Sequence, residues 1–367
     1  MVLPFLSKYL YEDLKFDESK VGWVLVAFGL GSFVGSYLGG ILSDKIGYYK
    51  VMVFSLFTSG LFFFVFPLIK SFEALCLAFF FLLLMADMFR PAMFVSIGAY
   101  AKPENRTRAL TLVRLAVNLG FAVGPAIGGL IIMGIGYDGL FWIDGLTCIL
   151  AISIFFFTVK ERPMKKDTSS NQPKPTKKLS FNFILFLFVI FLSGLTFFQF
   201  FTTMPLYHSE RYGLLEWQTG LILASNGFMI FLLEMPLVTY LETKMVNKIK
   251  IVVWGMFCMS IGFLVLMADF WIGVLFISTI FLTFGEMFAF PFSNAHALNQ
   301  APKGLEGYYM AMYSLSFSAA HIVSGKLGMT IIKNYGYTTN WLLMCVLAMV
   351  AVLIGIYVWK NPEKSKA

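Results

Sequence analysis

The chain has 367 residues, of which 59% are hydrophobic and only 13% are charged, and its mean hydropathy is +0.79. Water-soluble globular domains carry more charge than this, so the composition excludes that class and indicates a membrane protein. Whether the formal net charge of +8 reflects a nucleic-acid partner depends on where the basic residues lie along the chain.

Apolar runs long enough to cross a bilayer recur along the whole chain. A helix needs about 20 apolar residues to cross a hydrocarbon core roughly 30 Å thick. The runs do not alternate polar and apolar residues as the strands of a membrane barrel would, so we expect helices and an all-α integral membrane protein. Eleven runs meet this criterion, at residues 20–42, 51–69, 73–98, 108–133, 139–159, 181–206, 215–240, 250–268, 270–298, 306–332 and 338–359.

The basic residues between the runs favour one side of the membrane. Alternate loops carry 19 of the 28 lysines and arginines. The opposite loops and the N-terminal segment carry only Lys8, Lys15, Lys20, Lys70, Arg211 and Lys333. By the positive-inside rule the richer loops face the cytoplasm, which puts the C-terminus there and the N-terminus outside. We therefore expect no nucleic-acid partner, and a multi-pass protein of a bacterial-type inner (plasma) membrane.

A polar stretch divides the chain into two parts. Residues 161–180 contain the run DTSSNQPKPTKK, which is typical of a flexible linker, and we place it in the cytoplasm. Five complete runs precede this linker and six follow it. The predicted organisation is a helical half at 1–160, the linker at 161–180 and a second helical half at 181–367.

The two halves resemble each other at an offset of about 200 residues, which indicates a parallel internal repeat. Asp87 followed by Pro91 corresponds to Glu286 followed by Pro291, so each half places an acid in mid-span. The starts of two helices also correspond, through the residues Glu18, Gly22 and Leu25 and the residues Glu216, Gly220 and Leu223.

The repeat also bears on the beginning of the chain. Pro4 corresponds to Pro205, and Pro205 closes the helix expected at 181–206. Residues 1–9 therefore correspond to the outer end of a first helix whose preceding part, about 20 residues, is absent. A signal peptide is the alternative, but the segment has no basic start and its apolar run is too short. We expect eleven complete helices plus a stub of the first, in a chain that inserts but does not transport unless an upstream start restores that helix.

The sequence shows no pattern typical of an enzyme. It has no nucleotide-binding glycine loop, no metal-ligand cluster and no nucleophile elbow, so we expect no catalytic residues, no cofactor and no metal. The simplest energy source is then an ion gradient. The four cysteines lie inside apolar runs without paired spacing, which argues against a disulfide framework; they are Cys76, Cys148, Cys258 and Cys345.

The turn after the first complete run combines a small-residue helix end, an acid, a base and a turn glycine. Its key residues are Gly40, Asp44, Lys45, Gly47 and Lys50. The turn closely resembles the signature loop G-x-x-x-D-[RK]-x-G-[RK]-[RK] of the major facilitator superfamily, although Tyr48 replaces the first base after Gly47. The resemblance implies two six-helix halves and a gating role for Asp44, which we expect to pair with Arg106 or Arg108. Taken alone, the loop is also compatible with an ordinary positive-inside turn.

A second motif lies in the run at 108–133 and consists of Gly120, Gly124, Pro125, Gly128 and Gly129. It resembles the fifth-helix motif G-x-x-x-G-P-x-x-G-G of the same superfamily, which is often associated with proton-driven exporters. Without the family, the same residues describe a close helix-packing face bent by a proline. The fourth helix departs from many drug exporters of the family, because the fourth residue after Arg90 is Phe94 and not glycine.

Few ionisable residues lie within the apolar runs, and each needs a reason because charge in a bilayer is costly. Asp87 and Arg90 stand at i and i+3 on one helix face and could neutralise each other. Glu286 has no base within one turn of its own helix, which suits a group that binds and releases protons. Arg114 is expected to extend its charge toward the cytoplasmic interface. The predicted proton-coupling or cavity residues are Asp87, Arg90, Glu286, Glu234, His321 and Lys326. For His321 and Lys326 the alternative stays open that they satisfy backbone carbonyl groups.

Together these features predict a secondary active transporter that works by alternating access around a site near the membrane midplane. The favoured function is proton-coupled export of small amphipathic organic molecules, by an antiport mechanism. Two alternatives stay open: a proton-coupled importer of a small nutrient, and a non-transporting membrane scaffold or sensor on the same fold. The expected partners are a small-molecule substrate, protons and the lipid bilayer, and the expected state is a monomer.

Overall fold

The computed structural model describes residues 2–101, 106–162, 179–302 and 306–361, and these residues are almost entirely helical. The first part of the chain forms α1 (Leu3–Lys8), the π-helix η1 (Tyr9–Asp13), α2 (Glu18–Ile46), α3 (Tyr48–Val65), the short 3-10 helix η2 (Phe66–Leu68), α4 (Phe72–Asp87), α5 (Phe89–Tyr100) and α6 (Arg106–Thr158). The second part forms α7 (Phe181–Thr202), α8 (Met204–Tyr212), α9 (Glu216–Thr243), α10 (Lys248–Leu266), α11 (Gly273–Gln300) and α12 (Glu306–Lys360).

Nine helical stretches in the described residues are long and apolar enough to cross a membrane. Two of these, α6 and α12, each contain a break at one glycine, Gly136 with φ 75° and Gly336 with φ 79°. Both glycines lie between expected spans, and a side chain there would strain the backbone. Counting α6 and α12 as two spans each gives the eleven that the sequence predicts. The two breaks stand 200 residues apart, in agreement with the internal repeat.

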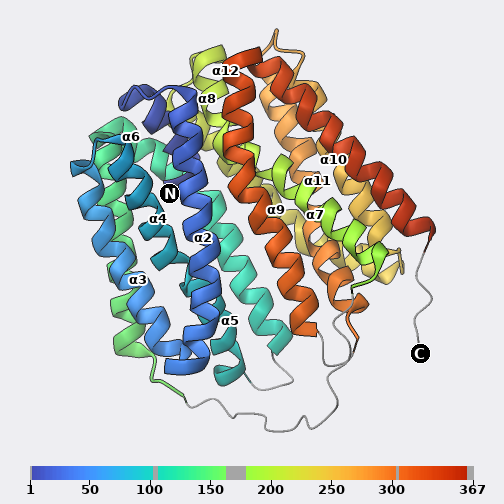
Figure 1. Cartoon of the computed structure of the whole chain (residues 1–367), viewed down its shortest axis with the longest axis horizontal. Helices are drawn as coiled ribbons and strands as arrows, with labels where there is room; N and C mark the ends of the chain where they lie inside the picture. The colour runs from blue at the N-terminus through green and yellow to red at the C-terminus, as the bar shows by residue number, and fades with distance from the viewer. Residues whose placement is uncertain (1, 102–105, 163–178, 303–305, 362–367) are drawn as a thin grey trace.

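The helices form two bundles that lie side by side (Figure 1). The first bundle contains α1–α6, drawn in blue to green, and the second contains α7–α12, drawn in yellow-green to red. The bundles contact each other mainly through α2 against α12 and α6 against α9. Most of the expected linker lies outside the described residues, so the exact division at 160 and 181 stays a prediction.

The two ends of the molecule differ in charge. The basic end holds the turn between α2 and α3 and the end of α5, at the bottom of Figure 1, and the end of α12, at the right of the picture. Its lysines are Lys45, Lys50, Lys160, Lys248 and Lys360. The acidic end, at the top, holds α8 and the starts of α2 and α9, with Asp17, Glu210 and Glu216. Between the ends, large apolar side chains such as Phe54, Phe157 and Leu353 are exposed around the bundle, as a lipid-facing surface requires.

Within the first bundle, glycines on α2 allow an unusually close approach of α4. A side chain at Gly31 or Gly35 would overlap the carbonyl oxygens of Phe80 and Leu84, and a Cβ at Gly39 would lie 2.6 Å from the Cα of Met88. The three glycines repeat every four residues and therefore share one helix face. This close packing places the end of α4, where the predicted site acid Asp87 lies, directly against α2.

Candidate functional site

The seam between α2 and α12 brings aromatic residues of both bundles together around His321. The His321 ring on α12 stacks on Phe198 of α7, with centroids 4.0 Å apart. It also meets the Phe28 ring of α2 at 5.5 Å and 77°. Phe198 in turn contacts Phe317, whose ring packs edge-on against Phe290 at 5.4 Å. His321 therefore lies at the edge of a phenylalanine cluster and contacts the first bundle through Phe28. The sequence did not predict this contact between the bundles.

Lys326 lies on the same seam, closer to the acidic end. Its ammonium donates hydrogen bonds to the carbonyl oxygen and the hydroxyl of Ser19, both at 3.0 Å. The ammonium also lies 4.8 Å from the centre of the Trp23 ring, within the range of a cation–π interaction. A Cβ at Gly22 would come within 2.7 Å of the Lys326 side chain. This lysine thus ties α12 to the start of α2.

The two mid-span acids are each hydrogen-bonded to a neighbouring helix, and these two helices, α2 and α9, correspond in the repeat. Asp87 at the end of α4 accepts a hydrogen bond from Ser32 of α2. Glu286 of α11 accepts one from Asn226 of α9 at 3.2 Å, and the same amide donates to Thr283 at 2.9 Å. Both acids are half-buried. Their orientation toward one shared cavity stays a prediction.

Arg90 is exposed and stands three residues after Asp87. Asp87 and His321 both contact α2, through Ser32 and Phe28, which are one helical turn apart. These two predicted site residues therefore lie near the same part of α2. Glu286 and Glu234 lie in two other groups, each built on α9.

The predicted fifth-helix motif lies on the second seam, where α6 packs against α9. A Cβ at Gly129 would lie 2.6 Å from the carbonyl oxygen of Glu216. Across the seam, a side chain at Gly220 would overlap the backbone of Pro125. Gly129 and Pro125 of the motif therefore lie on a close helix-packing face, which is the interpretation that the residues suggest without reference to the family. Gly120, in contrast, faces open space.

The same seam holds a buried carboxylate in mid-membrane. Glu234 is 5% exposed, and its Oε2 accepts a hydrogen bond from the Asn118 amide of α6 at 3.0 Å. Asn118 stands two residues before Gly120, at the start of the motif. The bond therefore connects the motif helix of one bundle to an ionisable group of the other, a pairing that no pattern in the sequence predicts.

The signature loop connects α2 to α3 at the basic end. Gly47 takes φ 95°, a conformation that favours glycine, and a Cβ there would lie 3.3 Å from Glu161. A Cβ at Gly40 would meet nothing within 4 Å, so Gly39 and not Gly40 is the residue that packs closely. Lys45 and Lys50 are exposed. The side chains of Asp44, Arg106, Arg108 and Arg114 lie outside the described part of the structure, so the expected pairing of Asp44 and the expected position of Arg114 stay predictions.

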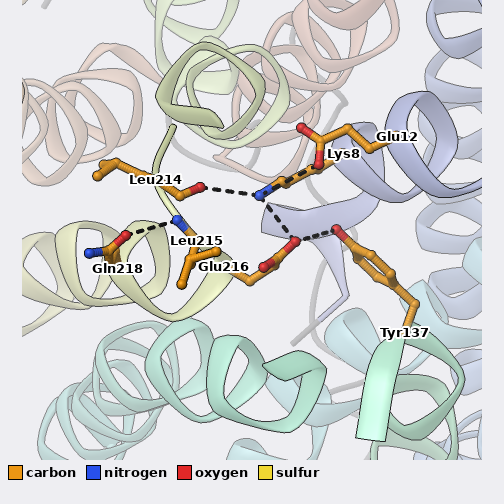
Figure 2. Close-up of polar contacts among 7 residues, drawn as sticks. All are labelled: Lys8, Glu12, Tyr137, Leu214, Leu215, Glu216 and Gln218. Carbon is orange, nitrogen blue, oxygen red and sulfur yellow. Dashed lines mark hydrogen bonds and ion pairs between the residues drawn. The ribbon is translucent and has the colours of Figure 1, made fainter. Parts of the chain in front are cut away.

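A buried ion pair joins the bundles at the acidic end (Figure 2). The Lys8 ammonium lies 3.1 Å from Glu216 of α9 and 3.6 Å from Glu12 of its own bundle. It also donates to the carbonyl oxygen of Leu214 at 3.4 Å, and the Tyr137 hydroxyl donates to Glu216 at 3.4 Å. Lys8 is only 2% exposed. In the sequence Lys8 is one of the bases outside the apolar runs, and Glu216 lies so far along the chain that no local pattern indicates their contact.

The surroundings of Lys8 contain a second basic side chain that stays neutral. Burial and the positive charge of Lys8 lower the pKa of His208 on α8 to about 3. Nearby at the same end, Lys333 donates to Asp17 at 2.6 Å and this hydrogen bond lowers the pKa of Asp17. Since Asp17 precedes α2 and Lys333 lies on α12, this exposed pair also crosses between the bundles.

Comparison with known proteins identifies the family. The sequence profile of the Major Facilitator Superfamily matches residues 1–322 and 219–367, and the chain therefore belongs to this superfamily of membrane transporters. YttB of Bacillus subtilis (strain 168), an uncharacterized MFS-type transporter, is 23% identical over 379 residues, covering 99% of this chain and 92% of its own. The quinolone resistance protein NorA of Staphylococcus aureus is 26% identical over 217 residues, covering 58% of this chain and 55% of its own.

Solved structures agree with this fold. A POT family transporter in complex with 5-aminolevulinic acid superimposes with a TM-score of 0.82 at 15% identity, covering 98% of this chain and 91% of that one. A mutant of the nucleoside transporter NupG superimposes with a TM-score of 0.70 at 16% identity, covering 98% of this chain and 95% of that one. At such identities the likeness establishes the major facilitator architecture of two helical halves. It confirms the fold class that the sequence predicts.

Proposed function

We propose that this chain is a secondary active transporter that exports small amphipathic organic molecules in exchange for protons, by alternating access. The observation that carries the proposal is the position of the contacts between the bundles. The pairs of Lys8 with Glu216, Lys326 with Ser19 and Lys333 with Asp17 all join the bundles toward the acidic end. Asp87 and His321 lie near the same part of α2, closer to the basic end than these pairs. This arrangement suits a state closed at the acidic end.

The positive-inside rule makes the basic end cytoplasmic, with the C-terminus on that side, and the acidic end external. The protein would then rest with its central site accessible from the cytoplasm of a bacterial-type cell, which suits the loading of an export substrate. Opening of the acidic end would require the Lys8–Glu216 pair to separate. The proton from outside would bind a carboxylate and be released inside as the halves rock.

Glu286 is the acid best suited to carry that proton. Its partner Asn226 is a neutral amide, and an amide N–H can donate to either protonation state of a carboxyl group. Glu234 is the second candidate, because its hydrogen bond to Asn118 crosses the seam and would change as the bundles move. Asp87 is bonded to Ser32 and has Arg90 three residues further along the chain, and in this proposal it is a substrate-contacting group.

Export is supported by the fifth-helix motif and by the similarity to a quinolone resistance protein. Import of a small nutrient is the second candidate, supported by the overall likeness to POT family transporters, one of which is described with a bound peptide conjugate. A quinolone and a dipeptide are therefore the two informative probes.

The test uses proteoliposomes that contain the protein expressed from its complete reading frame and a pH-sensitive dye inside. Under exchange, addition of a quinolone on the side of the basic end should move protons in the direction opposite to the quinolone. Proton movement in the same direction as an added dipeptide would support import. If neither probe nor a wider panel moves protons, the chain is a scaffold or sensor and the proposal fails.

A further inference from the structure

At the basic end, one corner of the first bundle is filled by two tyrosines. Tyr48 is the first residue of α3 and Tyr100 is the last residue of α5. Their rings meet edge to face at 6.0 Å. The Tyr48 hydroxyl donates to the carbonyl oxygen of Arg162 at 3.0 Å, and the Tyr100 hydroxyl donates to that of Lys160 at 2.7 Å. The corner is thus closed by side chains and by the chain that leaves α6.

The second bundle has a cavity at the corresponding corner. The first residue of α10 is Lys248 and the last residue of α11 is Gln300, each 200 positions after its tyrosine counterpart. The cavity has a volume of about 330 Å³, which is at the small end of the range for ligand sites. Its walls come from the ends of α7, α10, α11 and α12. The repeat therefore exposes a difference between the halves, because the second half lacks the two rings that fill this space in the first.

The polar lining of the cavity suits an anion. Lys248 supplies an ammonium, and Asn182, Asn299 and Gln300 supply amide groups. The residues that line the cavity include no aspartate or glutamate. Within the described ranges, the half-buried Lys248 ammonium has no carboxylate partner. The starts of α7 and α10 also lie here, and the positive ends of their dipoles add to the field of the lysine.

Beside these groups and the polar side chains of Ser180, Asn247 and His296, the cavity has apolar walls. Phe183, Ile249, Val358 and Trp359 line the cavity beside the polar groups. Lys250 lies outside it, with its ammonium 5.4 Å from the centre of the Trp359 ring. A tryptophan with lysines at the end of membrane-spanning helices marks the depth of the lipid headgroups. The site thus combines an anion-binding end with an apolar side at the surface of a bilayer.

We propose that this cavity binds the phosphate group of an anionic phospholipid, with Lys248 as its charged partner. A free phosphate would use the same donors but would leave the apolar walls without a partner, so the structure favours the lipid. The bound headgroup would bridge α7, α10, α11 and α12 at the basic end and stabilise their packing by mass action. The inference does not depend on what the protein transports.

The test measures lipid binding by the purified protein in detergent, with no transport step. Dioleoyl phosphatidylglycerol is the anionic probe, dioleoyl phosphatidylcholine the zwitterionic one and inorganic phosphate the soluble one. We expect phosphatidylglycerol to be retained in native mass spectra and to raise the melting temperature, with weaker effects from the other two. Equal retention of phosphatidylcholine, or equal stabilisation by inorganic phosphate, would overturn the lipid assignment.

Two variants and one control locate the site. Lys248→Gln should weaken phosphatidylglycerol binding by about tenfold, because a charge-assisted hydrogen bond is lost. Lys244→Gln removes an exposed lysine of the same end, which does not line the cavity, and should change nothing. The double variant Lys248→Tyr, Gln300→Tyr copies the filled corner of the first half, so it should fold and lose the lipid. Unchanged lipid affinity in the double variant would refute the proposal, even if Lys248→Gln alone fails to fold.

Discussion

The Lys8–Glu216 ion pair should set how often the acidic end of the molecule opens. The change that tests this is Lys8→Met, which keeps the length of the side chain and removes its charge. Glu216 and the carbonyl of Leu214 belong to the second bundle, so their contacts with Lys8, at 3.1 and 3.4 Å, must break when the bundles separate. Glu12 belongs to the same bundle as Lys8 and can stay bonded throughout.

The size of the effect follows from these contacts. A charge-assisted hydrogen bond between largely buried groups contributes about 2 kcal/mol, and the long bond to Leu214 adds little. Loss of the Lys8–Glu216 bond should therefore raise the population of the open state about 30-fold. Tyr137 still donates to Glu216 in the variant, which limits the penalty of leaving that carboxylate without its lysine.

Cysteine reactivity provides the assay. Met329 of α12 is fully buried at the acidic end against Gly22 and the core of the first bundle, so in a background without the native cysteines a Met329→Cys thiol reacts only when the acidic end opens. Lys8→Met should raise its rate with a membrane-impermeant maleimide about 30-fold, whereas the control Glu12→Gln should change the rate less than about threefold. A wild-type rate in folded Lys8→Met protein would refute the role of this pair as the closure.

Three further outcomes are expected. Gly129→Ala should lower the free energy of unfolding by about 1–3 kcal/mol, because the new Cβ would press on the backbone of α9, and the melting temperature should fall. The control Gly120→Ala places its Cβ in open space and should leave the melting temperature unchanged. Glu286→Gln should remove the pH dependence of transport while the protein keeps its melting temperature, and an unaltered pH profile would contradict the proton-carrying role. The Lys333 hydrogen bond lowers the pKa of Asp17 below 3.8, so this contact is complete above that pH and is lost only as the pH falls through the lowered pKa. Asp17→Asn should therefore raise the maleimide reaction rate of the buried cysteine by the same factor at every pH between about 5 and 8. If the variant and the wild type reacted at equal rates at pH 5, the contact would be lost at a higher pH than this pKa allows.

The sequence by itself determined the helices and their repeat. Membrane-spanning runs are local features, because each helix satisfies its own backbone hydrogen bonds and only its length and apolarity matter. The same locality explains why the spans around Gly136 and Gly336 could be separated, since a turn glycine interrupts the apolar run there. The fifth-helix motif also indicated a packing face, and the structure places Gly129 against the backbone of Glu216, although Gly120 faces open space.

Only the tertiary structure decided which residues meet across the bundles. Glu216 lies far along the chain from Lys8, and Asn118 is separated from Glu234 by 116 residues, so no periodicity within one helix predicts either pair. The same holds for Gly39, which packs against Met88 where the signature loop pointed to Gly40. Such pairs depend on the rotation and depth of each helix relative to its neighbours, and these are fixed by the packing of whole surfaces. The cavity beside Lys248 is a further example, because the corresponding corner of the first half is filled by tyrosines. It becomes visible only when the ends of α7, α10, α11 and α12 are placed together.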